Sequence, residues 1–142
     1  MATIWKELKV DVAADAAWNA IRDFSGAHRL FAGVVTATRM EPGGRVVTFA
    51  DGSEVREPLV AVDDEHRRLA WTVTGGPLTH HAASLQVVPD GDGSRIVWIT
   101  DILPDAAQPA IAGIVEHGAG ALQRFFYQQS KQKNGSSPGS QT

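Results

Sequence analysis

The sequence predicts an α+β fold in which a seven-stranded antiparallel sheet curls around one long C-terminal helix. Three observations lead to this fold class. Most segments before Pro104 alternate apolar and polar residues, the turns between them are short and rich in glycine, and the chain after Pro104 has helical spacing. Because one helix is narrower than a curved sheet of seven strands, we expect an internal hydrophobic cavity between the two.

The N-terminal part predicts one strand followed by two short helices. Residues 3–12 alternate in polarity at period two, which is typical of a strand. In residues 13–24 the apolar positions recur at helical spacing instead, and Asp15 near the start suits the positive end of a helix dipole. Residues 25–33 predict a turn and a short second helix.

The middle of the chain predicts six strands joined by tight turns. The Asp51–Gly52 pair is a strong hairpin signal, and glycine and proline mark further turns at residues 42–44 and 89–94. Strands connected in this way form an antiparallel meander, which the N-terminal strand can complete. The six strands are expected over residues 34–40, 45–50, 53–62, 68–75, 79–88 and 95–103.

A long helix is expected from Asp105 to about Lys131, where apolar residues form one helical stripe. Glycine in a helix interior costs about 1 kcal/mol relative to alanine, so the three glycines of this segment suggest a close approach or a bend. They are Gly113, Gly118 and Gly120. Residues 131–142 have no apolar side chains and predict a disordered polar tail after a single domain over residues 1–130.

Composition narrows the classes of function. The chain has 142 residues, a net charge of −3 and a pI of about 5.9, which weighs against a nucleic-acid-binding surface. It contains no cysteine, so disulfides, thiolate nucleophiles and cysteine zinc sites are excluded. The N-terminus carries charges within its first ten residues, and no long apolar run occurs anywhere. We therefore expect a cytoplasmic protein, monomeric or homodimeric, with no membrane or nucleic-acid partner.

The element order, together with "WNAIRDFSGAHRLFAGV" and the strands from residue 56 to residue 101, resembles the START-like (SRPBCC) superfamily over about residues 3–130. More narrowly it looks like the bacterial polyketide cyclase/dehydrase group, relatives of the Bet v 1 fold. The resemblance implies a helix-grip fold around a hydrophobic pocket, but the superfamily includes cyclases, lipid binders, lyases and co-chaperones. The positions that carry it are Trp18, Asp23, Phe24, Glu57, Asp63 or Asp64, and Trp98.

Glu57 is the leading candidate for a catalytic residue. It lies on the apolar phase of the strand over residues 53–62, where a core-facing strand normally stays apolar. A buried carboxyl has a raised pKa and can act as a general acid or base near neutral pH. The alternative is an ion pair with an arginine such as Arg22, Arg29 or Arg56 that holds the first helices to the sheet.

Three further residues could complete an acid–base lining. His81 shares its phase with an apolar row, and an inward imidazole can move protons at physiological pH, although a hydrogen-bonded core histidine is the alternative. Asp101 near the end of the last strand and His117 on the long helix could meet the same cavity. The alternatives are that Asp101 caps the turn at the strand end and that His117 lies on the surface. Together with Glu57 they would suit aldol cyclisation and dehydration.

Apolar side chains are candidates for ligand contacts, although the core is the default place for such residues. They are Phe31, Trp71, Trp98, Ile114 and Phe125, and His28 in the short helix would lie near the pocket mouth in the fold that the resemblance implies. No phosphate loop, calcium loop, nucleophile elbow or His-x-x-x-His pair occurs, so we expect no metal and no cofactor.

The first functional hypothesis is a pocket protein that binds a hydrophobic, cyclic or polyketide-like small molecule and catalyses cofactor-free cyclisation, dehydration or isomerisation. The second is a carrier with the same pocket and no chemistry. The third is an interaction module that uses its sheet edge or long helix.

Overall fold

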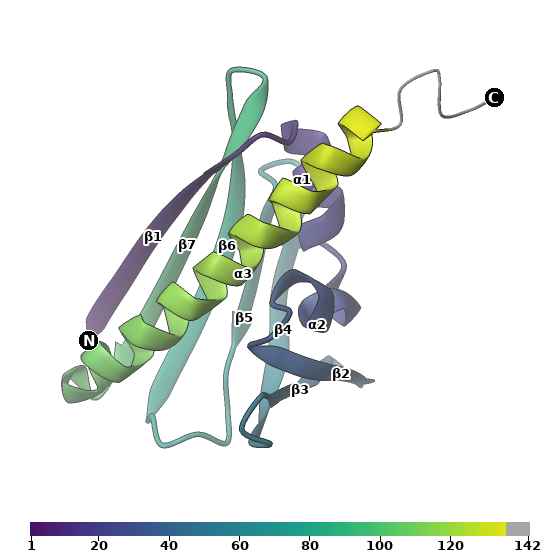
Figure 1. Ribbon diagram of the computed structural model, residues 1–142. Coiled ribbons are helices and arrows are strands. Elements are labelled where there is room, and N and C mark those ends of the chain that lie inside the picture. Colours follow the sequence, from purple (N-terminus) through teal and green to yellow (C-terminus); the bar gives the residue numbers. More distant parts are fainter. Residues whose placement is uncertain (136–142) are drawn as a thin grey trace.

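The computed structural model describes residues 1–135 and shows the predicted architecture of one curled sheet and one long helix (Figure 1). The helix-grip fold expected from the sequence is confirmed. No helix in this part of the chain is long and apolar enough to cross a membrane. The strands are β1 (Ala2–Val10), β2 (Val35–Glu41), β3 (Gly44–Phe49), β4 (Glu54–Asp63), β5 (Arg68–Thr72), β6 (His80–Asp90) and β7 (Gly93–Leu103).

The sheet is antiparallel throughout, with the strand order β1-β7-β6-β5-β4-β3-β2. Strands β2 to β7 therefore form the predicted meander, and β1 completes the sheet by pairing with β7. Each of the six strand segments expected between residues 34 and 103 overlaps an observed strand. A register shift between Leu59 and Ala61 interrupts the β4–β5 pairing, one residue after Pro58.

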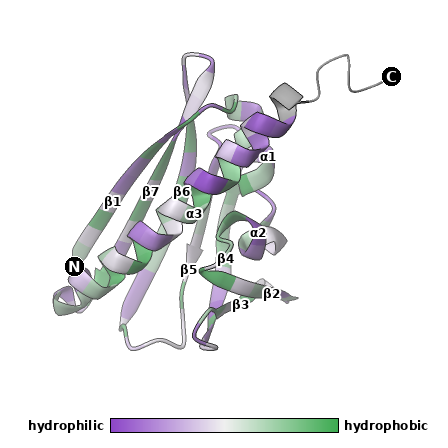
Figure 2. Cartoon of the chain, viewed as in Figure 1, coloured by the Kyte–Doolittle hydropathy of each residue, from purple (hydrophilic) through white to green (hydrophobic). Residues whose placement is uncertain are grey.

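The helices cover one face of this sheet. They are α1 (Ala14–Ile21), η1 (Phe24–Gly26), α2 (Ala27–Leu30), η2 (Asp105–Ala107) and α3 (Gln108–Gly135). Helix α3 packs against β1, while α1 packs against β6 and α2 against β2 (Figure 1). Figure 2 shows hydrophilic turns along the side of α3 that faces away from the sheet, as expected of an amphipathic cover.

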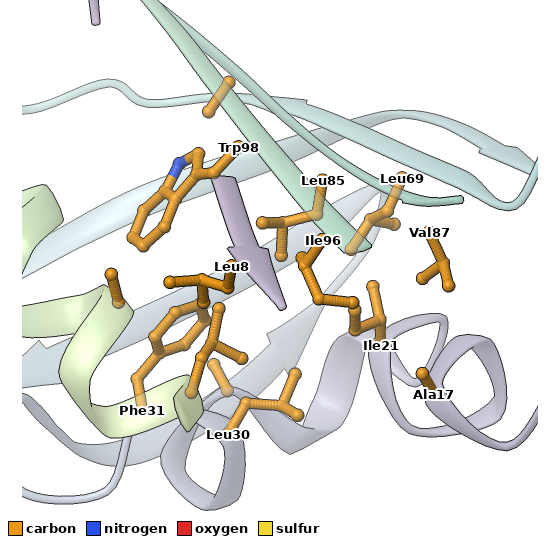
Figure 3. Packing of buried hydrophobic residues seen from close by; sticks show 14 of the residues in the cluster. Leu8, Ala17, Ile21, Leu30, Phe31, Leu69, Leu85, Val87, Ile96 and Trp98 are labelled. Atoms are coloured by element: carbon orange, nitrogen blue, oxygen red, sulfur yellow. The ribbon is translucent and has the colours of Figure 1, made fainter. Parts of the chain in front are cut away.

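The solid core lies between the sheet and the helices α1, α2 and the middle part of α3, from which Leu122 and Phe126 are fully buried. Ile21 of α1 meets Leu85 and Ile96 of the central strands in a cluster from which water is excluded (Figure 3). Helix α1 is also tied to the turn that follows β4, because the Trp18 indole nitrogen donates to Asp64 Oδ1 at 2.8 Å. Core packing and this polar contact together fix the helices at one end of the sheet.

Helix α3 is longer than the sequence predicts. Residues 131 to 135 were expected in the disordered tail, but they continue the helix to Gly135. Extending an existing helix adds one hydrogen bond for each residue ordered, so lysine and glutamine can prolong it without apolar contacts. The rest of the expected tail, residues 136–142, lies outside the described residues.

One helix glycine makes the close approach that the sequence suggested. A Cβ atom at Gly118 would lie 2.7 Å from Cη2 of Trp98, a distance that real side chains do not reach. The glycine therefore lets the Trp98 ring lie against the α3 backbone. At Gly113, by contrast, a Cβ atom would have no neighbouring atom within 4 Å.

Candidate functional site

A cavity of about 540 Å³ lies between the sheet and the N-terminal half of α3. The core fills the space under α1 and under the C-terminal half of α3, whereas the space under the N-terminal half of α3 is incompletely filled. Its walls come from the end of α2, strands β3 to β7 and α3. Apolar side chains form most of the lining, among them Phe31, Val34, Phe49, Val55, Trp71, Val73, Leu78, Trp98, Ile111, Ile114 and Val115.

The Glu57 carboxylate lines this cavity and forms a buried ion pair with Arg45. Arg45 Nε donates to Glu57 Oε1 at 2.7 Å, and Arg45 Nη2 lies 2.7 Å from the same oxygen. Arg45 and Glu57 are only 3% and 8% exposed. The two residues face each other because β3 and β4 pair Arg45 with Glu57 directly across the ladder.

The structure corrects the predicted partner of Glu57. The ion pair forms with Arg45, and none of the three arginines named from the sequence takes part, because each is engaged with a more exposed acid. Arg22 pairs with Asp64, Arg29 with Asp23, and Arg56 with Glu41.

Arg45 also ties the short helical turn η1 to the sheet. Its Nη1 donates to the backbone oxygen of Phe24 at 2.9 Å, and its guanidinium carbon lies 3.8 Å from the centre of the Phe24 ring. A second aromatic ring, that of Trp71, lies 5.4 Å from the same carbon. The ion pair is therefore an anchor between η1, β3 and β4 as well as part of the cavity wall.

Opposing effects act on the protonation of Glu57. Burial raises the pKa of this carboxyl above its ordinary value, while the Arg45 charge and hydrogen bonds from Arg45 and Trp71 act to lower it. Burial likewise lowers the pKa of Arg45, and Glu57 opposes that shift. Because an arginine stays protonated, the pair is held as a carboxylate and a guanidinium with no net charge.

Two histidines reach the cavity from opposite sides. His81 of β6 lines it from the sheet and His117 lines it from α3. Burial is the main cause that lowers the pKa of His81, and the neighbouring His80 adds to the shift. His81 is therefore a neutral imidazole at neutral pH, able to accept a proton from a bound molecule.

Three of the predicted site residues lie away from this cavity. Asp101 alternates with Thr100, which lines the cavity, so its side chain is on the opposite face and accepts a hydrogen bond from Thr3 Oγ1 at 2.6 Å. The His28 ring lies 3.0 Å from Thr38 Oγ1, between α2 and β2. Phe125 lies beyond the part of α3 that lines the cavity, and its ring packs edge-on against Phe126.

Trp98 and Phe31 form the wall where the cavity meets the core. Their ring centres are 5.4 Å apart, and Figure 3 shows both beside the cluster of buried aliphatic side chains. Trp98 is 8% exposed, and its indole Nε1 has no hydrogen-bond partner among the described residues. Phe31, Trp71, Trp98 and Ile114 all line the cavity.

Arg45 is the main residue of the site that the sequence analysis missed. The signal was present, because Arg45, Val47 and Phe49 share one phase of a predicted strand and the Asp51–Gly52 hairpin sets the register with the next. Among residues 1–135, no three histidine, aspartate or glutamate side chains are arranged so that they could hold a metal ion.

Comparisons with known proteins agree with this architecture. A family model described as polyketide cyclase/dehydrase and lipid transport matches residues 1–132. No curated protein matches the sequence. A protein of Thermobifida fusca with a solved structure is 31% identical over 88% of this chain and 93% of its own, with a TM-score of 0.73.

Two more distant structures share the fold. A START superfamily protein of Mycobacterium smegmatis is 16% identical, with 89% of this chain and 98% of that chain covered and a TM-score of 0.70. Norcoclaurine synthase of Thalictrum flavum is 23% identical, with 87% and 91% covered and a TM-score of 0.66. The resemblance to START-like proteins read from the sequence is confirmed.

Proposed function

Because the chain belongs to the polyketide cyclase/dehydrase and lipid transport family, we propose that it binds a hydrophobic, cyclic or polyketide-like small molecule and carries out cofactor-free acid–base chemistry on it. The reaction would be a cyclisation, dehydration or isomerisation. The observation that supports this proposal is a largely apolar cavity that His81 lines from the sheet and the exposed His117 lines from α3. A cavity of this kind suits a small apolar ligand held by a few polar groups.

The neutral His81 imidazole is the proton acceptor in this proposal. It removes a proton from a carbon next to a ligand carbonyl, and the electron pair that remains forms an enolate. The enolate carbon attacks a second carbonyl carbon of the same molecule, which forms the new carbon–carbon bond. His117 or the protonated His81 then gives a proton to the resulting alkoxide, which becomes a hydroxyl. In a dehydration a histidine removes a second proton from the carbon next to the carbonyl, the carbon–carbon double bond forms, and the hydroxyl takes a proton from the other histidine and leaves as water.

A carrier without chemistry is the second candidate. The observation that favours it is the contact between Glu57 and Arg45, which engages the cavity's carboxylate in an anchor. The fold itself is compatible with either function. Norcoclaurine synthase of Thalictrum flavum, which shares the fold, has been solved in complex with dopamine and hydroxybenzaldehyde.

The first experiment identifies the ligand. Native mass spectrometry of freshly purified protein should show a retained small molecule, released by denaturation and absent from protein purified after unfolding and refolding. If no molecule is retained and no apolar fluorescent probe binds the protein, the pocket proposal fails.

The second experiment separates the enzyme from the carrier. His81→Ala should retain ligand affinity within about threefold but abolish conversion of the ligand or its precursor, because only the proton acceptor is lost. His80→Ala is the matched control, because His80 is the neighbour of His81 in the sequence but does not line the cavity. If wild-type protein binds the molecule and converts neither it nor its precursors, the carrier function is the correct one.

A further inference from the structure

A second groove lies between the end of α2 and the C-terminal half of α3, with a volume of about 480 Å³. It shares no lining residue with the cavity described above. Figure 1 shows α2 beside this half of α3, and the two helices are in contact. The groove is lined by Arg29, Ala32, Ala121, Arg124, Phe125, Gln128, Gln129 and Gln132.

Positive charge gathers at this end of the molecule. Residues 117–132 of α3 include Arg124 and Lys131 but no aspartate or glutamate, although the whole chain carries a net charge of −3. Arg29 on the opposite wall is paired with Asp23 at 2.7 Å. Arg124 forms no ion pair within residues 1–135. Its guanidinium is thus an uncompensated charge on a groove wall.

Gly120 provides the space in which the Arg124 side chain lies. A Cβ atom at Gly120 would be 3.4 Å from Arg124 Nη1, which is tighter than most real contacts. Side chains on a helix lean toward its N-terminus, so a residue at position 120 is the one that Arg124 folds over. The Arg124 guanidinium therefore lies close to the α3 backbone at Gly120.

The remaining lining supplies polar and apolar contacts. Gln129 Oε1 is buried and has no hydrogen-bond partner in the described part of the chain, so it is an acceptor without a donor. The half-buried Phe125 ring offers a flat apolar surface beside it. A single ligand with an acidic group, a hydrogen-bond donor and an apolar body would meet all three features.

We propose that this groove is a second binding site, for a small organic molecule that carries an oxyanion. Its carboxylate or phosphate pairs with Arg124, its apolar body packs on Phe125, and an O–H or N–H group donates to Gln129 Oε1. Charge-assisted hydrogen bonds from a guanidinium to such oxyanions are among the stronger polar contacts in proteins. This site is independent of the cavity and does not rest on the function proposed for it.

Phenyl phosphate, benzoate and phenol test the proposal, since they share a ring and differ in their acidic group. In two-dimensional NMR titrations of the full chain, phenyl phosphate or benzoate should shift backbone amides of α2 and of residues 121–132, and phenol should not. Binding by one anion alone assigns the phosphate or the carboxylate. Added salt should weaken the binding.

Variants distinguish this site from general attraction of anions. Arg124→Gln should weaken binding of the favoured anion about tenfold, the loss expected for one charge-assisted contact. Arg39→Gln is the matched control, because Arg39 is an exposed arginine on β2 whose nearest acid, Glu54, is 3.8 Å away. Far-ultraviolet circular dichroism verifies that both variants keep their helix content.

Three results would overturn the proposal. They are equal affinity of wild type and Arg124→Gln, shifts confined to residues that line the cavity, and no saturable binding of either anion. Shifts confined to the cavity would support a ligand site there while they overturn this proposal, so the two sites are tested separately.

Discussion

Removing the Arg45 side chain should destabilise the protein far more than removing a surface charge. Arg45 and Glu57 are nearly inaccessible to water, so they behave as a buried ion pair, for which loss of one partner costs about 3–5 kcal/mol. In Arg45→Met the unfolding free energy should fall by about that amount and the melting temperature by on the order of 10 °C.

Replacing both partners should restore most of this stability. Arg45→Met with Glu57→Leu removes the uncompensated charge, leaving mainly the Phe24 carbonyl without its donor, and an unsatisfied buried acceptor costs about 1–3 kcal/mol. We expect the double variant to lie within about 2 kcal/mol of wild type, so the two substitutions are strongly non-additive.

The defect of Arg45→Met should depend on pH. With Arg45 absent, burial holds the pKa of Glu57 above its ordinary value of 4.5, so the folded protein binds a proton more tightly than the unfolded chain does. The defect is therefore smallest below pH 4.5, where the carboxyl is protonated in both states. It grows as the pH rises through the folded pKa of Glu57.

Urea unfolding at pH 5 and pH 8 measures these effects. Lys9→Met is the control, because Lys9 pairs with Asp90 at 2.8 Å at an exposed site, where such a pair contributes less than about 1 kcal/mol. The reasoning is refuted if Arg45→Met costs no more than Lys9→Met, if the double variant loses the sum of the single losses, or if the defect is larger at pH 5.

Two helix glycines should respond in opposite directions to alanine. Gly118→Ala drives a methyl group into Trp98 and should lower the unfolding free energy by about 1 kcal/mol after the gain in helix propensity, whereas Gly113→Ala meets open space and should raise it by up to about 1 kcal/mol. Urea unfolding measures both, and the same sign for both would contradict the close approach. In NMR titrations His81 should titrate below 6.5 because it is buried, and His66 above 6.5 because a carboxylate pairs with it. A pKa of His81 above that of His66 would show that the His81 side chain is not buried. Accordingly, stability contributed by the His66 pair should be lost as the pH rises through its folded pKa, and burial of His81 should cost stability below pH 6.5.

Local sequence patterns correctly predicted those site residues whose orientation depends on alternation within a single strand. Glu57 and His81 lie on inward phases that alternation alone identifies, and the structure places both at the cavity. Alternation also places Asp101 opposite Thr100 on β7, so the expectation that it reaches the cavity neglected the phase of its own strand. The Arg45 partner required the register between two strands, which the hairpin turn determines.

The sequence by itself determined the fold class, the order of the strands and the family, because apolar periodicity, turn residues and motif spacing are local and repeat along the chain. Tertiary structure alone decided which side chains meet across the cavity. How closely the α3 backbone approaches the Trp98 ring depends on Gly118, and whether the Glu57 charge is compensated depends on Arg45, twelve residues away. Such contacts join residues distant in sequence, and their distances follow from the packing of whole elements rather than from any one segment.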